Sequence, residues 1–263
     1  MLPRGNKMKI KSSIPPALIT SIISISFSAS SWASDVPYFV ISKQARPFQI
    51  ETNNQQHQGI ITEIVEAVFE NNNYSLSYNT FPYNRMMIQL ASDNYPNWVT
   101  YGSPNWGGLQ GENLSSIPVY KVQHALLSSK KVPFEFEGID KMKGKIAVLL
   151  DGFQYPGLQP YIDSGHLNEL RVKDYRAAFK VVERLAGESF FVEMDTRIKY
   201  NLMQQNKDLQ KYSLQYFGSV IPDYQIHLAY DPNMKPELQK YIDSRLMEMN
   251  QNGKLNKIVQ KYQ

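Results

Sequence analysis

The chain has 263 residues, with 28 lysines and arginines against 24 aspartates and glutamates, and it contains no cysteine. The missing cysteine excludes a disulfide scaffold, an iron–sulfur cluster, a zinc ribbon, a cysteine nucleophile and a lipidated cysteine anchor. Hydrophobic residues make up 42% of the chain, which is enough for a substantial core, and the length fits one large domain or two small ones.

The N-terminal segment 1–33 has the order of a secretory signal peptide: a basic start, a short apolar core and then small residues. The apolar core covers residues 14–27, the small residues end at Ala33, and the basic start contains Arg4, Lys7, Lys9 and Lys11. We therefore predict a cleavable signal peptide over residues 1–33 and export to the periplasm, with neither a lipid anchor nor membrane insertion after cleavage. A retained membrane anchor is the disfavoured alternative, because Pro15-Pro16 and several serines shorten the apolar run.

The predicted signal peptide carries the whole excess of positive charge. Without residues 1–33 the chain has 24 basic and 24 acidic residues and is formally neutral. No basic stripe for a phosphate backbone remains, so we expect no nucleic-acid partner.

The first half of the mature chain alternates between predicted strands and predicted helices. Residues 38–41 predict a strand, and apolar residues at helical spacing over 60–69 predict a helix that ends at the asparagines 71–73. Polar and apolar residues alternate over 74–78, which predicts a strand with one buried face, and residues 86–90 suggest a short helix. This order is typical of an α/β domain with a mainly parallel sheet.

A second unit of the same kind begins near Lys143. The continuous apolar run over 146–150 predicts a buried strand that ends at Asp151 and Gly152. Open α/β sheets bind ligands at the carboxyl ends of their strands, so this strand end is suited to a ligand loop. The remaining predicted elements are a helix over 177–185, a strand over 190–192 and two closing helices over 236–249 and 255–262.

Five segments carry recognisable motifs in a fixed order. The first is a proline–phenylalanine strand followed by a glycine and a helix start, at 46–64, and the second is a Ser-x-Pro-x-Tyr segment at 116–120. A Lys-Gly-Lys strand at 142–148 and a glycine loop at 152–155 follow. The last is a helix, a glycine and a second helix at 248–258. This order resembles the bacterial extracellular solute-binding proteins of family 3, the periplasmic solute-binding proteins of the polar amino-acid type. The similarity extends from about Val36 to Tyr262.

The resemblance implies a two-lobed α/β fold, the type II periplasmic-binding-protein fold or Venus flytrap, with two hinge strands. Residues 34–121 and 225–263 are expected to form lobe 1, and residues 122–224 are expected to form lobe 2. The amphipathic segment 120–127 is expected to form one strand, with His124 as a hinge residue. A ligand in the cleft would favour the closed form, because only there does it touch both lobes.

The resemblance also assigns ligand-binding residues to the cleft. They belong to a strand-end loop of lobe 1, to the glycine loop of lobe 2, and to the position of the acid that takes an amino group. These residues are Tyr101, Gly102, Ser103, Trp106, Phe153, Gln154, Tyr155 and Asp195, and we add Arg85, on the earlier helix after residues 81–83, as a candidate cation. For Trp106 the alternative is lobe packing, for Arg85 a structural ion pair, and for Asp195 a surface salt bridge with the nearby Arg197.

The chain departs from the family at the carboxylate-binding arginine. Relatives hold an α-carboxylate with the arginine of a Thr-x-x-Arg segment, a bidentate contact that lysine cannot copy. Here the matching segment is 105–108, Asn-Trp-Gly-Gly, and no arginine occurs between Met86 and Leu170. Binding of an ordinary free α-amino acid is therefore disfavoured. Arg85 is the candidate replacement, and together with Asp195 it would suit a zwitterionic or amine-bearing ligand.

We predict no catalytic residue, no metal site and no cofactor. The four histidines, at 57, 124, 166 and 227, lack metal-site spacing and are expected to be ordinary surface or hinge residues. No Gly-x-Ser-x-Gly elbow, Walker loop or His-Glu-x-x-His motif occurs. A few relatives of the fold are dehydratases of aromatic-precursor acids, and this alternative is disfavoured by the missing arginine.

The expected function is capture of a small polar ligand, amino-acid-like, an amine or a short peptide, for an ABC-type transporter. The expected partners are this ligand and an ABC permease or a membrane sensor protein, and the protein is expected to be a monomer. The alternative function is ligand sensing as the periplasmic partner of a sensor kinase or a cyclic-dinucleotide enzyme.

Overall fold

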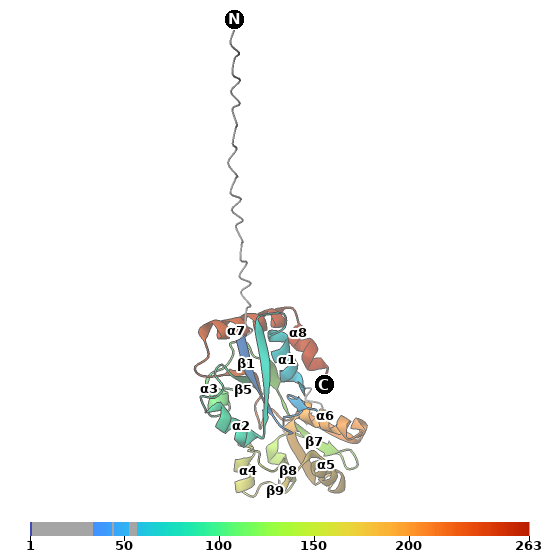
Figure 1. Cartoon of the computed structure of the whole chain (residues 1–263). Helices are drawn as coiled ribbons and strands as arrows, with labels where there is room; N and C mark the ends of the chain where they lie inside the picture. Colours follow the sequence, from blue (N-terminus) through green and yellow to red (C-terminus); the bar gives the residue numbers. More distant parts are fainter. Residues whose placement is uncertain (2–33, 44, 53–56, 263) are drawn as a thin grey trace. The chain divides into compact units, whose positions relative to one another are not determined.

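The computed structural model describes Met1 and residues 34–43, 45–52 and 57–262. Apart from Met1, the predicted signal peptide lies outside the described residues. The described chain contains two five-stranded sheets, each with helices packed against it (Figure 1), and the predicted α/β class is confirmed. We call the elements around the first sheet the first lobe and those around the second sheet the second lobe.

The first sheet is built from both ends of the described chain and has the strand order β4-β1-β5-β12-β6. Strand β1 runs parallel to β4 and β5, whereas β12 is antiparallel to β5 and β6. The strands are β1 (Ser34–Ile41), β4 (Tyr74–Phe81), β5 (Val99–Gly102), β6 (Tyr120–Val122) and β12 (Tyr224–Tyr230). The helices of this lobe are α1 (Ile60–Val68), α2 (Tyr83–Leu90), α3 (Leu109–Glu112), α7 (Pro236–Gln251) and α8 (Lys254–Gln260). Two short strands, β2 (Ile50–Glu51) and β3 (His57–Gln58), pair with each other.

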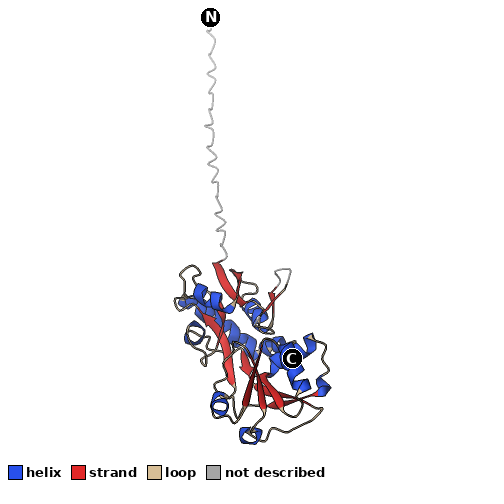
Figure 2. Ribbon diagram, turned by 90° about the horizontal axis from the view of Figure 1, so that it is seen from below, coloured by secondary structure: helices blue, strands red, loops and turns tan. Residues whose placement is uncertain are grey.

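The second sheet has the order β11-β7-β10-β8-β9 and the same division into parallel and antiparallel pairs. Strand β8 is parallel to β9 and β10, and β7 is antiparallel to β10 and β11. The strands are β7 (His124–Ser129), β8 (Ile146–Leu150), β9 (Asn168–Val172), β10 (Ser189–Met194) and β11 (Tyr212–Tyr216). The helices are α4 (Gln159–Asp163), α5 (Tyr175–Arg184) and α6 (Asp195–Gln204), with short 3₁₀ helices η1 (Ile139–Met142) and η2 (Leu209–Lys211). Figure 2 shows the strands of both sheets in one view.

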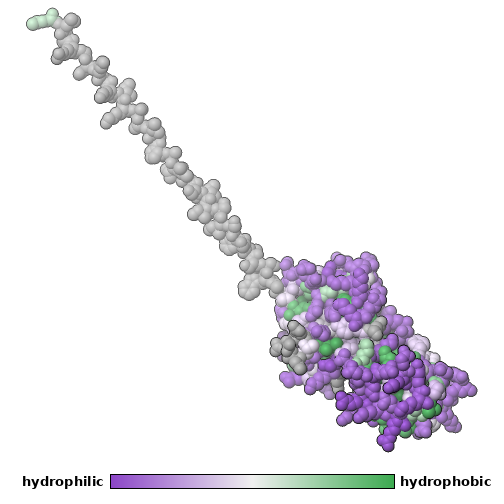
Figure 3. Space-filling view, turned by 90° about the vertical axis from the view of Figure 1, so that its right-hand side faces the viewer, coloured by the Kyte–Doolittle hydropathy of each residue, from purple (hydrophilic) through white to green (hydrophobic). Residues whose placement is uncertain are grey.

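Burial on both faces explains why strands β8 and β10 of the second sheet have continuous apolar runs. On β10, Phe190 and Val192 pack into one hydrophobic cluster together with Phe217, whereas Phe191 packs into another with Phe179 of α5. Successive side chains of a strand point to opposite faces, so one apolar run supplies both clusters. On the face shown in Figure 3, the described surface is mainly hydrophilic, with small separate hydrophobic patches.

The prediction of one strand over 120–127 is wrong, because the chain changes sheets within it. Strand β6 ends at Val122 and pairs with β12 of the first sheet, whereas β7 begins at His124 and pairs with β10 and β11 of the second. Gln123 lies between the two strands, and its carbonyl oxygen accepts a hydrogen bond from the backbone N–H of Asp195 (3.0 Å). The chain returns to the first sheet between β11 and β12, so two crossings join the lobes.

Gly102, the last residue of β5, packs directly against the backbone of α3. A Cβ atom at this position would lie 1.9 Å from the carbonyl oxygen of Gln110. We expect Gly102→Ala to lower the free energy of unfolding by about 1–3 kcal/mol, since overpacking forces the backbone to shift. Urea denaturation measures this change. Gly107→Ala is the matched control, because a Cβ there meets no atom within 4 Å; equal losses in the two variants would contradict the prediction.

Candidate ligand-binding site

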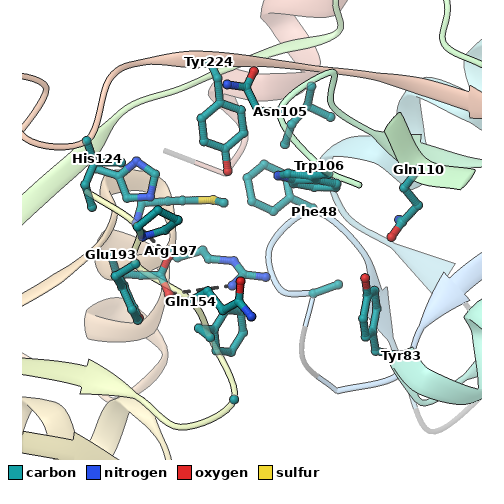
Figure 4. Close-up of a pocket in the computed structure, with 18 of the residues that line it drawn as sticks. Phe48, Tyr83, Asn105, Trp106, Gln110, His124, Gln154, Glu193, Arg197 and Tyr224 are labelled. Carbon is teal, nitrogen blue, oxygen red and sulfur yellow. Dashed lines mark hydrogen bonds and ion pairs between the residues drawn. The ribbon is translucent and has the colours of Figure 1, made fainter. Parts of the chain in front are cut away.

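A cavity of about 650 Å³ lies between elements of the two lobes (Figure 4). This volume is within the range of small-molecule sites. The first lobe lines it with residues that follow β1, with residues around β5 and α3, and with the start of β12. The second lobe lines it with His124 of β7, the loop 151–157 after β8, and the junction of β10 with α6.

Four aromatic side chains of the first lobe form a continuous wall of the cavity. Phe48 stacks on Tyr101 with ring centroids 6.3 Å apart, and Tyr101 meets Trp106 edge to face at 5.6 Å. Trp106 in turn meets Tyr224 edge to face at 6.3 Å. We call Phe48, Tyr101, Trp106 and Tyr224 the aromatic wall. Ring faces and edges of this kind favour a planar or apolar ligand group.

The two phenols of the aromatic wall stay protonated at neutral pH. Burial raises the pKa of Tyr101 to about 12, although the charge of Arg197 opposes the shift. Burial also raises the pKa of Tyr224 to about 12, and the hydrogen bond from Trp106 to its hydroxyl opposes this. Both hydroxyls therefore remain neutral hydrogen-bonding groups next to the cavity.

Ser103 holds the loop that carries Trp106 through three hydrogen bonds. Its backbone N–H donates to the carbonyl oxygen of Gln110 (2.9 Å), and its own carbonyl oxygen accepts from the backbone N–H of Trp106 (2.9 Å). Its Oγ accepts from the backbone N–H of Asn105 (3.3 Å). Gly102 and Ser103 thus lie behind the cavity lining and position it, while Asn105, Trp106 and Gln110 form it.

The second lobe brings a buried ion pair to the cavity. The Arg197 Nη1 atom of α6 lies 3.8 Å from Oε2 of Glu193 at the end of β10, and the two side chains are only 7% and 4% exposed. The guanidinium carbon of Arg197 lies over the ring of Phe48, 5.8 Å from its centroid, and over the ring of Phe153 at 5.6 Å. Since Phe48 belongs to the first lobe and Phe153 to the second, the cation joins the two sides of the cavity (Figure 4).

Glu193 is fixed by its neighbours, and Arg197 stays charged. Glu193 Oε1 accepts from the backbone N–H of Met194 (2.8 Å), and Oε2 accepts from the hydroxyl of Tyr175 (3.2 Å). Burial opposes the charge on Arg197, but Tyr175 and Glu193 outweigh this cost and raise the pKa of the guanidinium further above its usual value. The site therefore contains a permanent cation at any physiological pH.

The loop after β8 is held by Arg171 of β9. Its Nη1 donates to the carbonyl oxygens of Leu150 (3.0 Å) and Phe153 (2.7 Å). The guanidinium carbon of Arg171 also lies over the ring of Tyr155, 5.4 Å from the centroid. The backbone N–H of Leu150 donates to the hydroxyl of Tyr155 (3.2 Å), which fixes the loop from the other side.

The structure brings five of the nine predicted site residues to the cavity lining, namely Tyr101, Trp106, Phe153, Gln154 and Tyr155. Gly102 and Ser103 are buried behind it. Arg85 is exposed on α2, with its guanidinium over the ring of Phe81. Asp195 lies outside the cavity lining; its carboxylate accepts hydrogen bonds from Thr196 (3.1 Å) and Lys199 (3.2 Å).

Sequence reasoning missed the two residues at the centre of the charged side, Glu193 and Arg197. It treated Arg197 only as a salt-bridge partner for Asp195, whereas the ion pair of Asp195 is with Lys199. The sequence does contain a signal, because Glu193 directly follows the apolar run 190–192 of a buried strand. A charged residue at the carboxyl end of such a strand is seldom buried without a partner and lies where α/β sheets bind ligands.

Two α/β lobes with a cavity between them are typical of solute-binding proteins, and comparison with family models identifies the family. The chain belongs to the bacterial extracellular solute-binding proteins of family 3, whose family model matches residues 39–263. The family expected from the motifs is therefore confirmed. No curated protein sequence matches the chain.

Solved structures share the fold at low sequence identity. Substrate-binding domain 2 of GlnP from Lactococcus lactis, in an open conformation, is 16% identical with a TM-score of 0.63, over 88% of this chain and 95% of that one. A structure from work on glutathione import through GshT and the cystine importer TcyBC of Streptococcus mutans is 18% identical with a TM-score of 0.65, over 87% and 94%. A histidine kinase sensor domain similar to periplasmic binding proteins is 17% identical with a TM-score of 0.62, over 87% and 95%. The predicted two-lobed type II fold is confirmed.

Within residues 34–43, 45–52 and 57–262, no helix has both the length and the apolar character needed to cross a membrane. The same residues contain no group of three or more histidine, aspartate or glutamate side chains placed to hold a metal ion.

His124 is expected to make the stability of the protein depend on pH. Burial lowers the pKa of His124 below its usual value, against the opposing charges of Glu193, Asp223 and Asp195, and Arg197 adds to the lowering. Among the described residues, none hydrogen bonds to its Nδ1. Between the lowered folded-state pKa and the unfolded value of about 6.5, the unfolded chain binds more protons, so stability rises with pH.

We therefore expect the free energy of unfolding to fall as the pH decreases from 7.5 through about 6.5, by at most about 1.4 kcal/mol per pH unit for one histidine. Urea unfolding between pH 7.5 and 5.5 measures this slope. His124→Gln removes the titrating group and is expected to flatten the profile. An identical slope in the variant and the wild type would show that another group is responsible.

Proposed function

We propose that the protein is an exported solute-binding protein that captures a small polar ligand, amino-acid-like, an amine or a short peptide, for an ABC-type transporter. Membership of the family supports this proposal, and the cavity lined by both lobes is the observation that carries it. In this proposal residues 34–121 and 225–263 form lobe 1, and residues 122–224 form lobe 2. Val122 and Tyr224, the end residues of lobe 2 in this division, pair with each other between β6 and β12 of the first sheet, next to the two crossings.

Ligand capture would act by stabilising the contact between the lobes. A ligand that touches both the aromatic wall and Arg197 has more contacts when the lobes are together, so binding shifts the balance between the open and closed forms. The cation–π contact of Arg197 with Phe48 also joins the lobes, and it contributes on the order of 1–2 kcal/mol when desolvated.

Sensing for a membrane partner is the second candidate function. The observation that favours it is the shared fold of the histidine kinase sensor domain. The two functions use the same ligand cavity and differ in the protein that docks on the lobes. Co-purification with a permease or with a sensor from the native membrane distinguishes them.

We propose that the protein does not turn over its ligand. A dehydratase of this fold needs a cleft acid or base, and Glu193 is the buried carboxylate next to the cavity. Both of its oxygens accept hydrogen bonds, from Met194 and Tyr175, and Arg197 lies beside it. These contacts support a positioning role for Glu193 rather than proton transfer.

The test of ligand capture is a thermal-shift screen of amino acids, polyamines, short peptides and small sugars. A ligand present at 100 times its Kd stabilises the folded state by about 2.7 kcal/mol, so a binder raises the melting temperature by several degrees. Unchanged melting temperatures for every compound would contradict the proposal. Mass spectrometry of each binder after prolonged incubation tests the absence of turnover.

The proposed export signal gives a prediction for the mature N-terminus. We expect the protein produced with its leader in a Gram-negative host to be recovered from the periplasm with Ser34 as its first residue, because the small residues up to Ala33 suit a signal peptidase. N-terminal sequencing or intact mass measures this. Recovery in the membrane fraction with residues 1–33 attached would support a retained anchor instead.

A further inference from the structure

The charged and aromatic residues of the cavity lie on opposite sides of it. Asp151, Glu193 and Arg197, the charged residues among the described lining, all belong to the second lobe. The first-lobe lining consists of aromatic, aliphatic and glycine residues together with the neutral amides Asn105 and Gln110. A ligand that complements both sides of the cavity has a charged group at one end and an apolar, planar group at the other.

The charge that this cavity accepts is negative. Arg197 is the permanent cation of the lining, and its guanidinium presents N–H donors in a planar fork, which is the geometry that pairs with a carboxylate. Glu193 Oε2 lies 3.8 Å from Nη1 of this fork and forms an ion pair with it. Gln154 of the second lobe also lines the cavity and adds an amide to the same side.

An ammonium group fits the second-lobe side less well. Glu193 already accepts hydrogen bonds from the Met194 N–H and the Tyr175 hydroxyl, so each of its two oxygens has a donor. Asp151 is exposed and lies at the loop after β8. An added cation would have to approach the guanidinium within the buried part of the cavity, where like charges repel strongly.

The opposite side of the cavity suits a ring. The aromatic wall presents a series of faces and edges with centroid separations of 5.6–6.3 Å, and its two hydroxyls stay neutral. Aromatic pairs add about 0.5–1.5 kcal/mol beyond the burial of their area. Ordinary polar amino acids would leave this wall without a matching group.

We propose that the ligand is an aromatic carboxylate whose carboxylate is held by Arg197 in the second lobe and whose ring lies on the aromatic wall of the first lobe. This inference rests on the proposed function and adds the ligand class and orientation. It also explains the departure from the family at residues 105–108. The carboxylate-binding arginine expected in the first lobe is replaced by one in the second, so the ligand lies in the reverse direction.

Isothermal titration calorimetry of the wild-type protein tests the head group without any variant. The probes are 3-phenylpropionate, its neutral amide 3-phenylpropanamide, the amine phenethylamine, and propionate, which keeps the carboxylate without the ring. We expect 3-phenylpropionate to bind most tightly and the amide to bind about ten- to hundredfold more weakly, the usual effect of losing a charge-assisted hydrogen bond. Equal binding of acid and amide, tighter binding of the amine, or no binding of 3-phenylpropionate overturns the inference.

Two variants locate the two ends of the ligand. Arg197→Lys keeps the charge but removes the planar fork, so we expect about ten- to hundredfold weaker binding of 3-phenylpropionate. Trp106→Leu is expected to weaken 3-phenylpropionate but not propionate. The matched control is Arg85→Lys, since Arg85 is exposed and outside the lining. An unchanged Kd in folded Arg197→Lys protein overturns the assignment of the carboxylate.

The general thermal-shift screen separates this inference from the proposed function. If a polar amino acid, polyamine, peptide or sugar raises the melting temperature while 3-phenylpropionate does not, the binding function stands and the ligand class is wrong. If neither the general screen nor the aromatic probes give binding, both fail.

Discussion

The pairing of β6 with β12 is the constraint on which the rest of the molecule depends. It places the two chain crossings side by side, and Lys121 next to one crossing forms an ion pair with Asp223 next to the other (2.9 Å). The first turn of α6 is tied to the same place, through the Asp195 N–H on Gln123 and a hydrogen bond between the hydroxyls of Tyr120 and Thr196. Arg197, the next residue after Thr196, is therefore held at the junction of the lobes.

This placement explains why the Arg197 guanidinium is buried there, although burial of a charge is unfavourable. A guanidinium taken out of water needs a partner, and Glu193 with the rings of Phe48 and Phe153 supplies one. The same contacts keep the cation at the wall between the lobes rather than on the surface. Stability, the position of the hinge and the chemistry of the cavity are thus coupled through α6.

Much of the fold was accessible from the sequence because strand and helix periodicities are local. The apolar run 146–150 and the helical spacing over 60–69 identified two elements, and the order of the motifs identified the family. The break of the strand at Gln123 was not predicted, since a change of strand partner leaves the polar and apolar pattern intact. The cavity lining was predicted in part, because a family motif gives positions such as Asp195 without giving the direction of the side chain. Glu193 and Arg197 depend on how β10 meets α6, which is a property of packing.

The position of Trp106 beside Tyr224 makes the fluorescence of Trp106 sensitive to the cavity. Of the three tryptophans, Trp32 belongs to the predicted signal peptide and Trp98 is buried in the first-lobe core, so Trp106 is the indole that faces the cavity. Its N–H is hydrogen-bonded to the Tyr224 hydroxyl, beside the crossing strands. The emission of Trp106 is expected to change with the polarity of the cleft, whereas Trp98 is shielded in the core, so the protein carries a fluorophore at the place where its lobes meet.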